Sequence, residues 1–341
     1  MIAPADPCGH LHPGAPGGNL VRDTLPDWRD DAVKAVYIEA YGGRDQLRYG
    51  DLPEPRVGPR DVLIEVHAAA VNPVDWKIRN GWLKQRVQYA FPLILGWDLA
   101  GVVVKTGPEV TRLQVGDEVF SRPDIARNGA YAEYIAVDER LVAKKPSRLS
   151  FEEAAAVPLA ALTAWEALVE VAHVQAGQRV LIHAGAGGVG VYAIQLAKHF
   201  GAEVTTTVSA KNVGLVKELG ADRVIDYTAE DFTKDGRVYD IVFDTVGSEV
   251  QEQSLDVVKP GGILVSIVSP PKPEACEERG IRGAWFFLEP DGEKLAKIGR
   301  LIEEGRVRPV VGAVFPLEEA ARAHELSEYR HLQGKIVLRV K

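Results

Sequence analysis

A cluster of glycines between a predicted strand and a predicted helix constrains the fold of this chain more than any other feature. Residues 179–200 read RVLIHAGAGGVGVYAIQLAKHF, where a β-branched run stops at the spacing G-x-G-x-x-G and an amphipathic segment follows. Gly185 permits a tight turn, Gly187 lets a pyrophosphate approach backbone N–H groups, and Gly190 allows the helix to pack closely. The pattern predicts a dinucleotide-binding turn; the alternative is an ordinary glycine-rich turn.

Composition excludes several classes of protein. The 341-residue chain carries a net charge of -8 without a basic run, which argues against a nucleic-acid surface. No apolar stretch is long enough to span a bilayer. Cys8 and Cys276 are its two cysteines, so a disulfide framework and a cysteine-rich zinc lobe are excluded. We therefore expect a soluble, cytoplasmic protein that acts on neither nucleic acids nor membranes.

Residues 1–32 differ from the rest of the chain, because proline and glycine recur there without hydrophobic periodicity. This composition predicts a disordered arm. The arm lacks the apolar core of a signal peptide, and its aspartates disfavour a mitochondrial presequence. His10 and His12 could hold a metal, although we favour a solvated tail.

Two patterns divide the remaining chain. Short β-type runs separated by glycine and proline, at 33–38, 61–66, 100–104, 117–120 and 131–137, predict a β-rich, partly barrel-like domain. Ser150 to Glu153 then has the spacing of a capping box and opens a helical stretch. Beyond it, strands at 179–183, 203–208, 223–226, 240–244, 263–268 and 285–288 alternate with helices at 191–200, 212–219 and 250–258. This alternation predicts an α/β fold with a doubly wound, parallel six-stranded Rossmann sheet.

The predicted domains follow from these patterns. They are a disordered arm at 1–32, a β-rich catalytic domain at 33–153 and 299–341, and a nucleotide-binding Rossmann domain at 154–298. The tail holds a helix near 317–327 and a strand at 335–340. Neither has a place in the six-stranded sheet, so we expect the tail to return to the β-rich domain.

The residues after the second Rossmann strand favour NADPH over NADH. An NAD-binding domain places an acidic residue at the carboxyl end of this strand, but Glu203 stands at its start, away from the ligand. The carboxyl end instead offers Ser209, Lys211 and Asn212, whose hydroxyl, ammonium and amide groups suit a 2′-phosphate. The alternative is that Ser209 only caps the next helix and Lys211 is solvated.

Five motifs from residue 33 onward carry a family resemblance. They are VNPVDWKIRNG at 71–81, PLILGWDLAG at 92–101, VGDEV at 115–119, LGAD at 219–222 and GKIVL at 334–338. With the glycine turn, the chain resembles the medium-chain dehydrogenase/reductase superfamily, in its zinc-independent quinone oxidoreductase branch with a GroES-like catalytic domain. Zinc alcohol dehydrogenases of that superfamily have cysteine and histidine where this chain has Asn72 and Trp97. The resemblance therefore implies no metal site, and it implies a homodimer.

Reduction without a metal needs hydrogen-bond donors for the anion that forms when hydride is added. Our catalytic candidates are Asn72 through its amide and Lys77 through its ammonium group, with Asp75 orienting Lys77. The alternatives are a structural turn at Asn72 before Pro73 and a surface role for Lys77.

Other polar residues have weaker claims to the site. Asp98 lies beside the vacant metal position and could pair with a basic group. Tyr131 could face the pocket, although a core role is favoured. His183 and His324 are expected to be structural.

The resemblance also implies the cofactor contacts. The glycine turn itself would supply Gly185, Ala186, Gly187, Gly188, Val189 and Gly190. Strand ends and facing loops would supply Thr163, Tyr227, Thr245, Val246, Gly247, Val268 and Ser269.

These features together predict an NADPH-dependent reductase that transfers hydride to quinones or to the C=C bond of α,β-unsaturated carbonyl compounds. The expected partner is a small, apolar, electrophilic substrate, because Trp76, Trp82, Trp97 and Phe286 fall near the expected pocket. One alternative is a specialised biosynthetic enone or enoyl reductase. Another is a crystallin-like protein that binds NADPH with little turnover.

Overall fold

The computed structural model describes residues 28–329 and 332–341. The described chain forms two compact units, each treated by itself below. The parallel-sheet unit contains residues 166–185 and 196–287, and the β-rich unit contains residues 28–165, 186–195 and 288–341 apart from 330 and 331.

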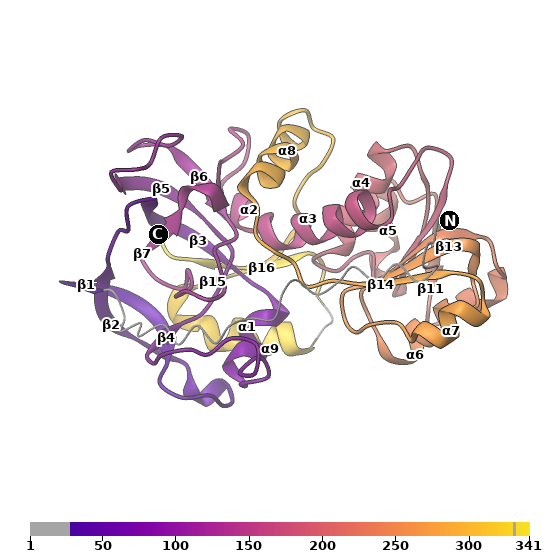
Figure 1. The fold of residues 1–341 in the computed structure, drawn as a ribbon, viewed down its shortest axis with the longest axis horizontal. Helices are drawn as coiled ribbons and strands as arrows, with labels where there is room; N and C mark the ends of the chain where they lie inside the picture. The colour runs from indigo at the N-terminus through magenta and orange to yellow at the C-terminus, as the bar shows by residue number, and fades with distance from the viewer. Residues whose placement is uncertain (1–27, 330–331) are drawn as a thin grey trace, which may run out of the picture. The chain divides into compact units, whose positions relative to one another are not determined.

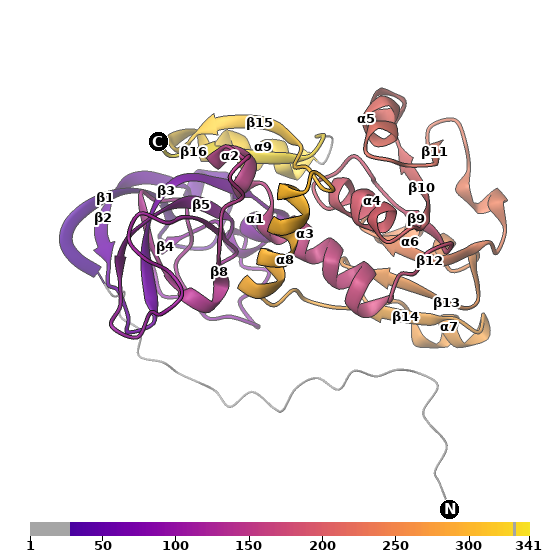
Figure 2. The same cartoon turned by 90° about the horizontal axis from the view of Figure 1, so that it is seen from above.

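The parallel-sheet unit is built on six strands in the order β11-β10-β9-β12-β13-β14 (Figure 2). All five pairings between neighbouring strands are parallel, which confirms the predicted Rossmann-type sheet. The strands are β9 (Arg179–Ile182), β10 (Glu203–Val208), β11 (Arg223–Asp226), β12 (Tyr239–Asp244), β13 (Val258–Ser266) and β14 (Arg282–Trp285).

Apolar residues in register across the middle strands form the core of this sheet. Leu181, Val242 and Leu264 lie side by side on β9, β12 and β13, and all three are fully buried. Parallel strands are covered on both faces, so such runs are apolar throughout. The helices that alternate with the strands are α4 (Gly190–His199), α5 (Val213–Glu218), α6 (Ser248–Ser254) and α7 (Pro273–Glu278).

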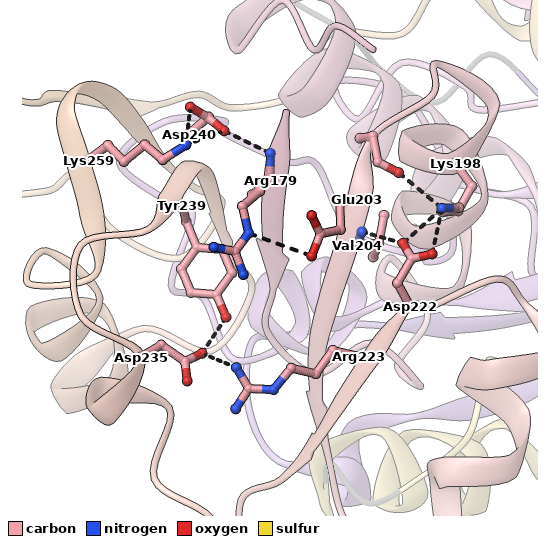
Figure 3. Close-up of polar contacts among 11 residues, drawn as sticks. Arg179, Lys198, Glu203, Val204, Asp222, Arg223, Asp235, Tyr239, Asp240 and Lys259 are labelled. Atoms are coloured by element: carbon pink, nitrogen blue, oxygen red, sulfur yellow. Dashed lines mark hydrogen bonds and ion pairs between the residues drawn. The ribbon is translucent and has the colours of Figure 1, made fainter. Parts of the chain in front are cut away.

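Charged residues form ion pairs at the edge of this sheet where the parallel strands begin, as Figure 3 shows. Glu203 starts β10 and lies 3.6 Å from Arg179 at the start of β9. Arg223 donates to the Asp235 carboxylate at 2.7 Å, and the Tyr239 hydroxyl donates to the same oxygen. Glu203 is therefore part of an ion-pair network at the edge away from the strand carboxyl ends, as the sequence predicts.

The β-rich unit contains two sheets (Figure 1). The smaller has the order β2-β1-β4, with β1 (Trp28–Ile38), β2 (Arg48–Pro55) and β4 (Leu93–Ile94). The larger has the order β15-β16-β3-β5-β6-β8, and β7 pairs with β3 off this path. Its strands are β3 (Asp61–Val71), β5 (Leu99–Thr106), β6 (Glu118–Ser121), β7 (Tyr134–Asp138), β8 (Val142–Lys144), β15 (Val311–Pro316) and β16 (Lys335–Arg339).

Short helices connect these strands. Ser150 caps α2 through the predicted capping box, since it accepts from the Glu153 amide at 3.2 Å while Glu153 accepts from the Ser150 amide at 2.9 Å. The helices are α1 (Pro73–Arg79), α2 (Phe151–Ala155), α3 (Pro158–Trp165), α8 (Gly292–Glu303) and α9 (Ala320–Tyr329). Shorter helical turns lie at Arg44–Gln46, Glu139–Leu141, Glu166–Val171, Ala210–Asn212, Phe232–Asp235 and Leu317–Glu319.

The tail returns to the β-rich unit, because β16 pairs antiparallel with β3 in the register Ile336–Val71.

Three boundaries differ from prediction. Residues 28–32 belong to β1 through backbone pairing with β2, whereas 1–27 of the predicted arm lie outside the described residues. Residues 154–165 and 288–298 group with the β-rich unit. The strand predicted at 285–288 ends at Trp285.

Candidate functional site

The glycine turn lies between β9 and α4, and its left-handed residue is Ala184 rather than a glycine. Ala184 adopts a left-handed φ of 53° directly after β9, and the Gly185 amide donates to the Thr207 carbonyl at 3.2 Å. Within the β-rich unit, Gly334 donates to the Ala186 carbonyl at 2.8 Å, and a side chain on Gly188 would meet the Lys335 side chain at 3.0 Å. The turn is therefore tightly enclosed, and α4 begins at its last glycine, Gly190.

Most of the other predicted cofactor residues follow the carboxyl ends of the parallel strands, the edge where such sheets bind ligands. The Val246 and Gly247 amides both donate to the Asp244 carboxylate, at 2.9 and 2.8 Å, and Gly247 has a φ of 80°. A side chain on Gly247 would meet Val268 at 2.6 Å. Tyr227 and Val268 are exposed at this edge.

Ser209 and Lys211 also lie at this edge, immediately after β10. Ser209 precedes the turn Ala210–Asn212, but its hydroxyl makes no capping hydrogen bond there. Capping therefore does not explain this serine. Thr163 differs, because its hydroxyl donates back to the Leu159 carbonyl at 2.7 Å inside α3.

His183 is a buried structural histidine. Its ring nitrogens contact the Thr207 hydroxyl at 3.1 Å and the Ser254 hydroxyl at 2.9 Å. Burial lowers the pKa of His183 to about 4, so the ring is neutral near pH 7. The structural role expected from the sequence agrees with this environment.

A buried polar cluster lies in the β-rich unit, where α1, β16 and the segment before β5 meet. Asn72 Nδ2 donates to Asp98 Oδ2 at 2.8 Å, and the Lys335 ammonium donates to Asn72 Oδ1. Lys335 also lies 3.3 Å from Asp98 Oδ2 and 3.2 Å from the Val71 carbonyl. Lys335 is 4% exposed, Asn72 2% and Asp98 0%. Asp98 therefore pairs with a basic group, as the sequence suggests, and that group is Lys335.

Asp98 is stabilised as a carboxylate by the donors around it. Burial raises the pKa of Asp98, and the Lys335 ammonium, the Asn72 amide and the Leu159 backbone amide oppose this rise. The Leu159 amide donates to Asp98 Oδ1 at 2.7 Å, so both carboxylate oxygens accept hydrogen bonds and neither donates. An ionised carboxylate satisfies this pattern.

These contacts fix the orientation of the Asn72 amide. Lys335 can only donate and the Asp98 carboxylate can only accept, so the amide oxygen faces Lys335 and the amide nitrogen faces Asp98. One N–H of the amide is used by Asp98. The second N–H is the group that Asn72 can offer to a further acceptor.

A second buried chain of polar groups starts from Asp75. Its Oδ2 accepts from the Asn72 backbone amide and from the Tyr131 hydroxyl, each at 2.8 Å. Tyr131 lies 3.3 Å from His324, and His324 lies 3.0 Å from Arg79. All four side chains are buried, so Tyr131 and His324 are core residues, as favoured from the sequence.

Asp75 and Lys77 are in different environments on α1. Asp75 is fully buried, and desolvation raises its pKa to about 7. Lys77 is half-buried, with its ammonium nitrogen 5.7 Å from the centre of the Trp76 ring. Residues two apart on a helix point to different faces. Asp75 holds the Asn72 backbone amide and the Tyr131 hydroxyl, and its orientation of Lys77 stays a prediction.

Sequence reasoning missed two buried cations near this cluster, Lys335 and Arg122. Lys335 stands in the GKIVL motif but is separated from Asn72 by 263 residues, and only the pairing of β16 with β3 joins them. Arg122 directly follows β6 and is 2% exposed. An arginine after an apolar strand resembles a surface residue in sequence, so no local signal marks it.

The parallel sheet with its glycine turn and the β-rich unit with its buried polar cluster define the class of dinucleotide-binding oxidoreductase folds. Residues 58–147 match the family model described as alcohol dehydrogenase GroES-like domain, and residues 219–338 match that described as zinc-binding dehydrogenase. The chain belongs to the medium-chain dehydrogenase/reductase superfamily. In the part of the chain that the structure describes, no helix is both long and apolar enough to cross a membrane.

Several relatives support this assignment. The chain is 41% identical over 322 residues to a 2-methylene-furan-3-one reductase of Solanum lycopersicum, covering 90% of this chain and 79% of the relative. It is 40% identical over 320 residues to an NADPH-dependent alkenal/one oxidoreductase of Arabidopsis thaliana, with the same coverage. The solved quinone oxidoreductase of Coxiella burnetii superimposes with a TM-score of 0.83 at 37% identity, covering 91% of this chain and 100% of that chain.

A zinc ion of the kind that the second family model names does not fit the residues of the polar cluster. Asn72 and Trp97 offer no thiolate or imidazole, both oxygens of Asp98 already accept hydrogen bonds, and the Lys335 ammonium sits on the same atoms. Across residues 28–329 and 332–341, no group of three or more His, Cys, Asp or Glu side chains could hold a metal. The cation in this cluster is the Lys335 ammonium group of the chain itself.

The Lys335–Asp98 pair generates the first prediction. Lys335→Met leaves a buried carboxylate without its cation, which costs about 3–5 kcal/mol of unfolding free energy. Adding Asp98→Asn removes the unpaired charge, so the double variant is expected to recover at least half of that loss. Urea unfolding of both single variants, the double variant and the wild type measures the coupling. A loss below about 1 kcal/mol in Lys335→Met would contradict the pairing.

The second prediction concerns pH. Because the pKa of Asp75 is raised to about 7 from 3.8, the folded protein keeps a proton that the unfolded chain releases. The stability from this proton is present below about pH 4 and is lost progressively as pH rises toward 7, by roughly 4 kcal/mol at most. Asp75→Asn cannot titrate, so its unfolding free energy should fall less over this window. Parallel curves for the two proteins would show that Asp75 does not titrate in this way.

Proposed function

We propose that this protein is a zinc-independent, NADPH-dependent reductase that adds hydride to quinones or to the C=C bond of α,β-unsaturated carbonyl compounds. The observation that carries the proposal is the Lys335 ammonium held between Asn72 and Asp98, against Gly188 of the glycine turn. This arrangement supplies positive charge and an oriented amide donor beside the dinucleotide turn.

NADPH, when bound, supplies the hydride. Its pyrophosphate would lie on Gly185, Ala186, Gly187, Gly188, Val189 and Gly190, and its 2′-phosphate would contact Ser209, Lys211 and Asn212. The exposed carboxyl edge of the sheet would supply Tyr227, Thr245, Val246, Gly247, Val268 and Ser269, and α3 would supply Thr163. The solved mycobacterial relative at 33% identity and a TM-score of 0.80, a complex with NADPH, supports this choice.

Asn72 is the residue that would act on the acceptor most directly. Its oxygen is engaged by Lys335 and one N–H by Asp98, so its second N–H is the donor left for an acceptor. A donor fixed before the reaction costs no reorganisation when the acceptor oxygen becomes anionic. Lys77, half-buried next to Trp76, is the candidate to relay a proton to the product.

Relatives support both acceptor classes. The tomato and Arabidopsis relatives are named for reduction of furanones and of alkenals or alkenones, whereas the Coxiella structure is named a quinone oxidoreductase. In each case the acceptor places negative charge on an oxygen after hydride addition. We further propose a homodimer in the cytoplasm, which sedimentation and cell fractionation would test.

The proposed function is tested by NADPH oxidation over a panel of quinones, alkenals and alkenones, with product analysis. A saturated carbonyl product identifies C=C reduction, and a hydroquinone identifies quinone reduction. Tight NADPH binding with no turnover of any acceptor would instead support a binding protein and contradict the proposal.

The third prediction concerns the choice of cofactor. Lys211→Glu replaces an ammonium by a carboxylate at the proposed 2′-phosphate contact, and charge-assisted hydrogen bonds contribute about 1.5–3 kcal/mol each. We expect kcat/KM for NADPH to fall about 10- to 100-fold while kcat/KM for NADH does not fall. Lys217→Glu makes the same change on exposed α5 and serves as the control. An unchanged NADPH to NADH ratio in Lys211→Glu would disprove the contact.

The fourth prediction concerns turnover. Asn72→Ala removes the oriented donor, so kcat should fall about 100-fold or more while NADPH binding is kept. Lys77→Ala should also lower kcat, and solvent buffers should partly rescue it if Lys77 relays a proton. Lys84→Ala, an exposed lysine beyond α1, is the matched control. Full kcat in Asn72→Ala would refute the assignment.

A further inference from the structure

Arg122 is a buried cation that contacts no carboxylate in the described chain. The described structure buries four arginine or lysine side chains almost completely, namely Arg79, Arg122, Lys145 and Lys335. Lys145 lies 3.0 Å from the Glu118 carboxylate. Arg79 contacts Glu328 at 2.7 Å and Lys335 contacts Asp98 at 3.3 Å. Arg122 instead donates to one backbone carbonyl, that of Pro123, at 2.8 Å. Its Nε has no hydrogen-bond partner among the described residues.

Burying such a charged group lowers the stability of the folded protein. An arginine without a counterion loses its hydration and gains little in return, at a cost of several kcal/mol. Ser121, just before Arg122, pairs with Leu99, just after Asp98, so the strand register brings Arg122 to the polar cluster. The charges of Asp98, Asp124, Glu289 and Asp75 oppose the lowering of the Arg122 pKa by burial, but none of these carboxylates accepts a hydrogen bond from it. Both Asp98 oxygens are already occupied by Leu159, Asn72 and Lys335. The fold therefore holds Arg122 near the polar cluster without neutralising it.

A second buried donor without a described partner, the Tyr89 hydroxyl, accompanies Arg122. The Tyr89 hydroxyl is buried and has no partner among the described residues, and its ring centre lies 6.3 Å from that of Trp97. Arg122 is close enough to Tyr89 to oppose the rise of its pKa. Trp76 Nε1, on α1 beside Asp75, is a third buried donor without a described partner. The two unsatisfied donors Arg122 Nε and the Tyr89 hydroxyl indicate that an acceptor atom belongs beside them.

We propose that Arg122, assisted by Tyr89, is the donor site that binds the carbonyl oxygen of the acceptor and stabilises its negative charge. This inference rests on the proposed function and deepens it. It makes Arg122 a catalytic residue, whereas Lys335 remains a positioning residue that acts through Asn72. The ligand class is an α,β-unsaturated carbonyl compound whose oxygen becomes an enolate oxygen.

The reaction balances with these groups. Hydride from NADPH forms a C–H bond at the β-carbon, the C=C π pair moves toward the carbonyl carbon, and the carbonyl π pair becomes a lone pair on oxygen. Arg122 meets that oxygen as its charge develops, when a charge-assisted hydrogen bond is strongest. A proton then bonds to the α-carbon, the oxygen regains its double bond, and the products are the saturated carbonyl compound and NADP⁺.

The test uses 4-nitrophenol as a mimic of the enolate, added to the protein with NADP⁺ bound. The nitrophenolate anion has its own visible absorption band, so the charged and neutral forms of the bound probe are measured separately. Wild-type protein is expected to bind the anion more tightly than neutral 4-nitrophenol. Arg122→Gln should lose about 10- to 100-fold in affinity for the anion, with affinity for the neutral form changed less than about twofold.

Companion variants separate this role from a structural one. Arg122→Lys keeps the charge and should retain part of the anion affinity, which also covers the case in which Arg122→Gln does not fold. Tyr89→Phe should lose a smaller fraction, because a neutral donor contributes less than a charged one. Arg60→Gln, an exposed arginine, is the control and should match the wild type.

The outcomes distinguish this proposal from the proposed function. A wild type that reduces no acceptor with NADPH would refute the function, whatever the probe shows. Wild-type turnover combined with unchanged anion affinity and unchanged kcat in Arg122→Gln and Arg122→Lys would overturn the role of Arg122 alone. A wild type that binds the neutral probe in preference to the anion would overturn it as well.

Discussion

The buried contact of Lys335 with Asp98 and Asn72 is the interaction on which the rest of the candidate site depends. A lysine that is 4% exposed must meet its counterion inside the protein, so β16 has to reach β3 in one register. The Lys335 side chain also lies against Gly188, where it leaves little room for any side chain in the turn. One ion pair thus joins the chain's tail, the glycine turn and the proposed catalytic amide.

Two buried carboxyl groups near Asn72 have different partners and therefore different chemistry. Asp98 receives an ammonium group and two amides, which favour the charged form. Asp75 receives a backbone amide and a hydroxyl but no cation within hydrogen-bond range, and its pKa rises to about 7. Their surroundings give the two carboxyl groups different protonation. Desolvation favours the neutral form, whereas a nearby cation favours the charged form. The cluster can thus hold one fixed charge beside one titrating group.

Sequence reasoning recovered the elements whose signals are local. The glycine turn, the six parallel strands and the capping box at Ser150 depend on residues within a few positions of one another. The edge strand β2 was not predicted, because backbone pairing with β1 forms it without an apolar run. Lys335 and Arg122 were missed for a different reason. The burial of both side chains is set by tertiary packing, and the contact of Lys335 with Asn72 joins residues 263 positions apart, which no local pattern encodes.

The proposed role of Arg122 bears on how a site with Asn72 and Trp97, which offer no thiolate or imidazole, would stabilise an acceptor oxygen. A metal ion supplies concentrated positive charge that can polarise an acceptor oxygen. Here Lys335 cannot do so directly, because Asn72 and Asp98 already engage its ammonium group. A second cation that the fold leaves unneutralised could polarise that oxygen, at the expense of folding free energy. Two roles that one metal would combine, organising the site and stabilising charge, are then divided between Lys335 and Arg122.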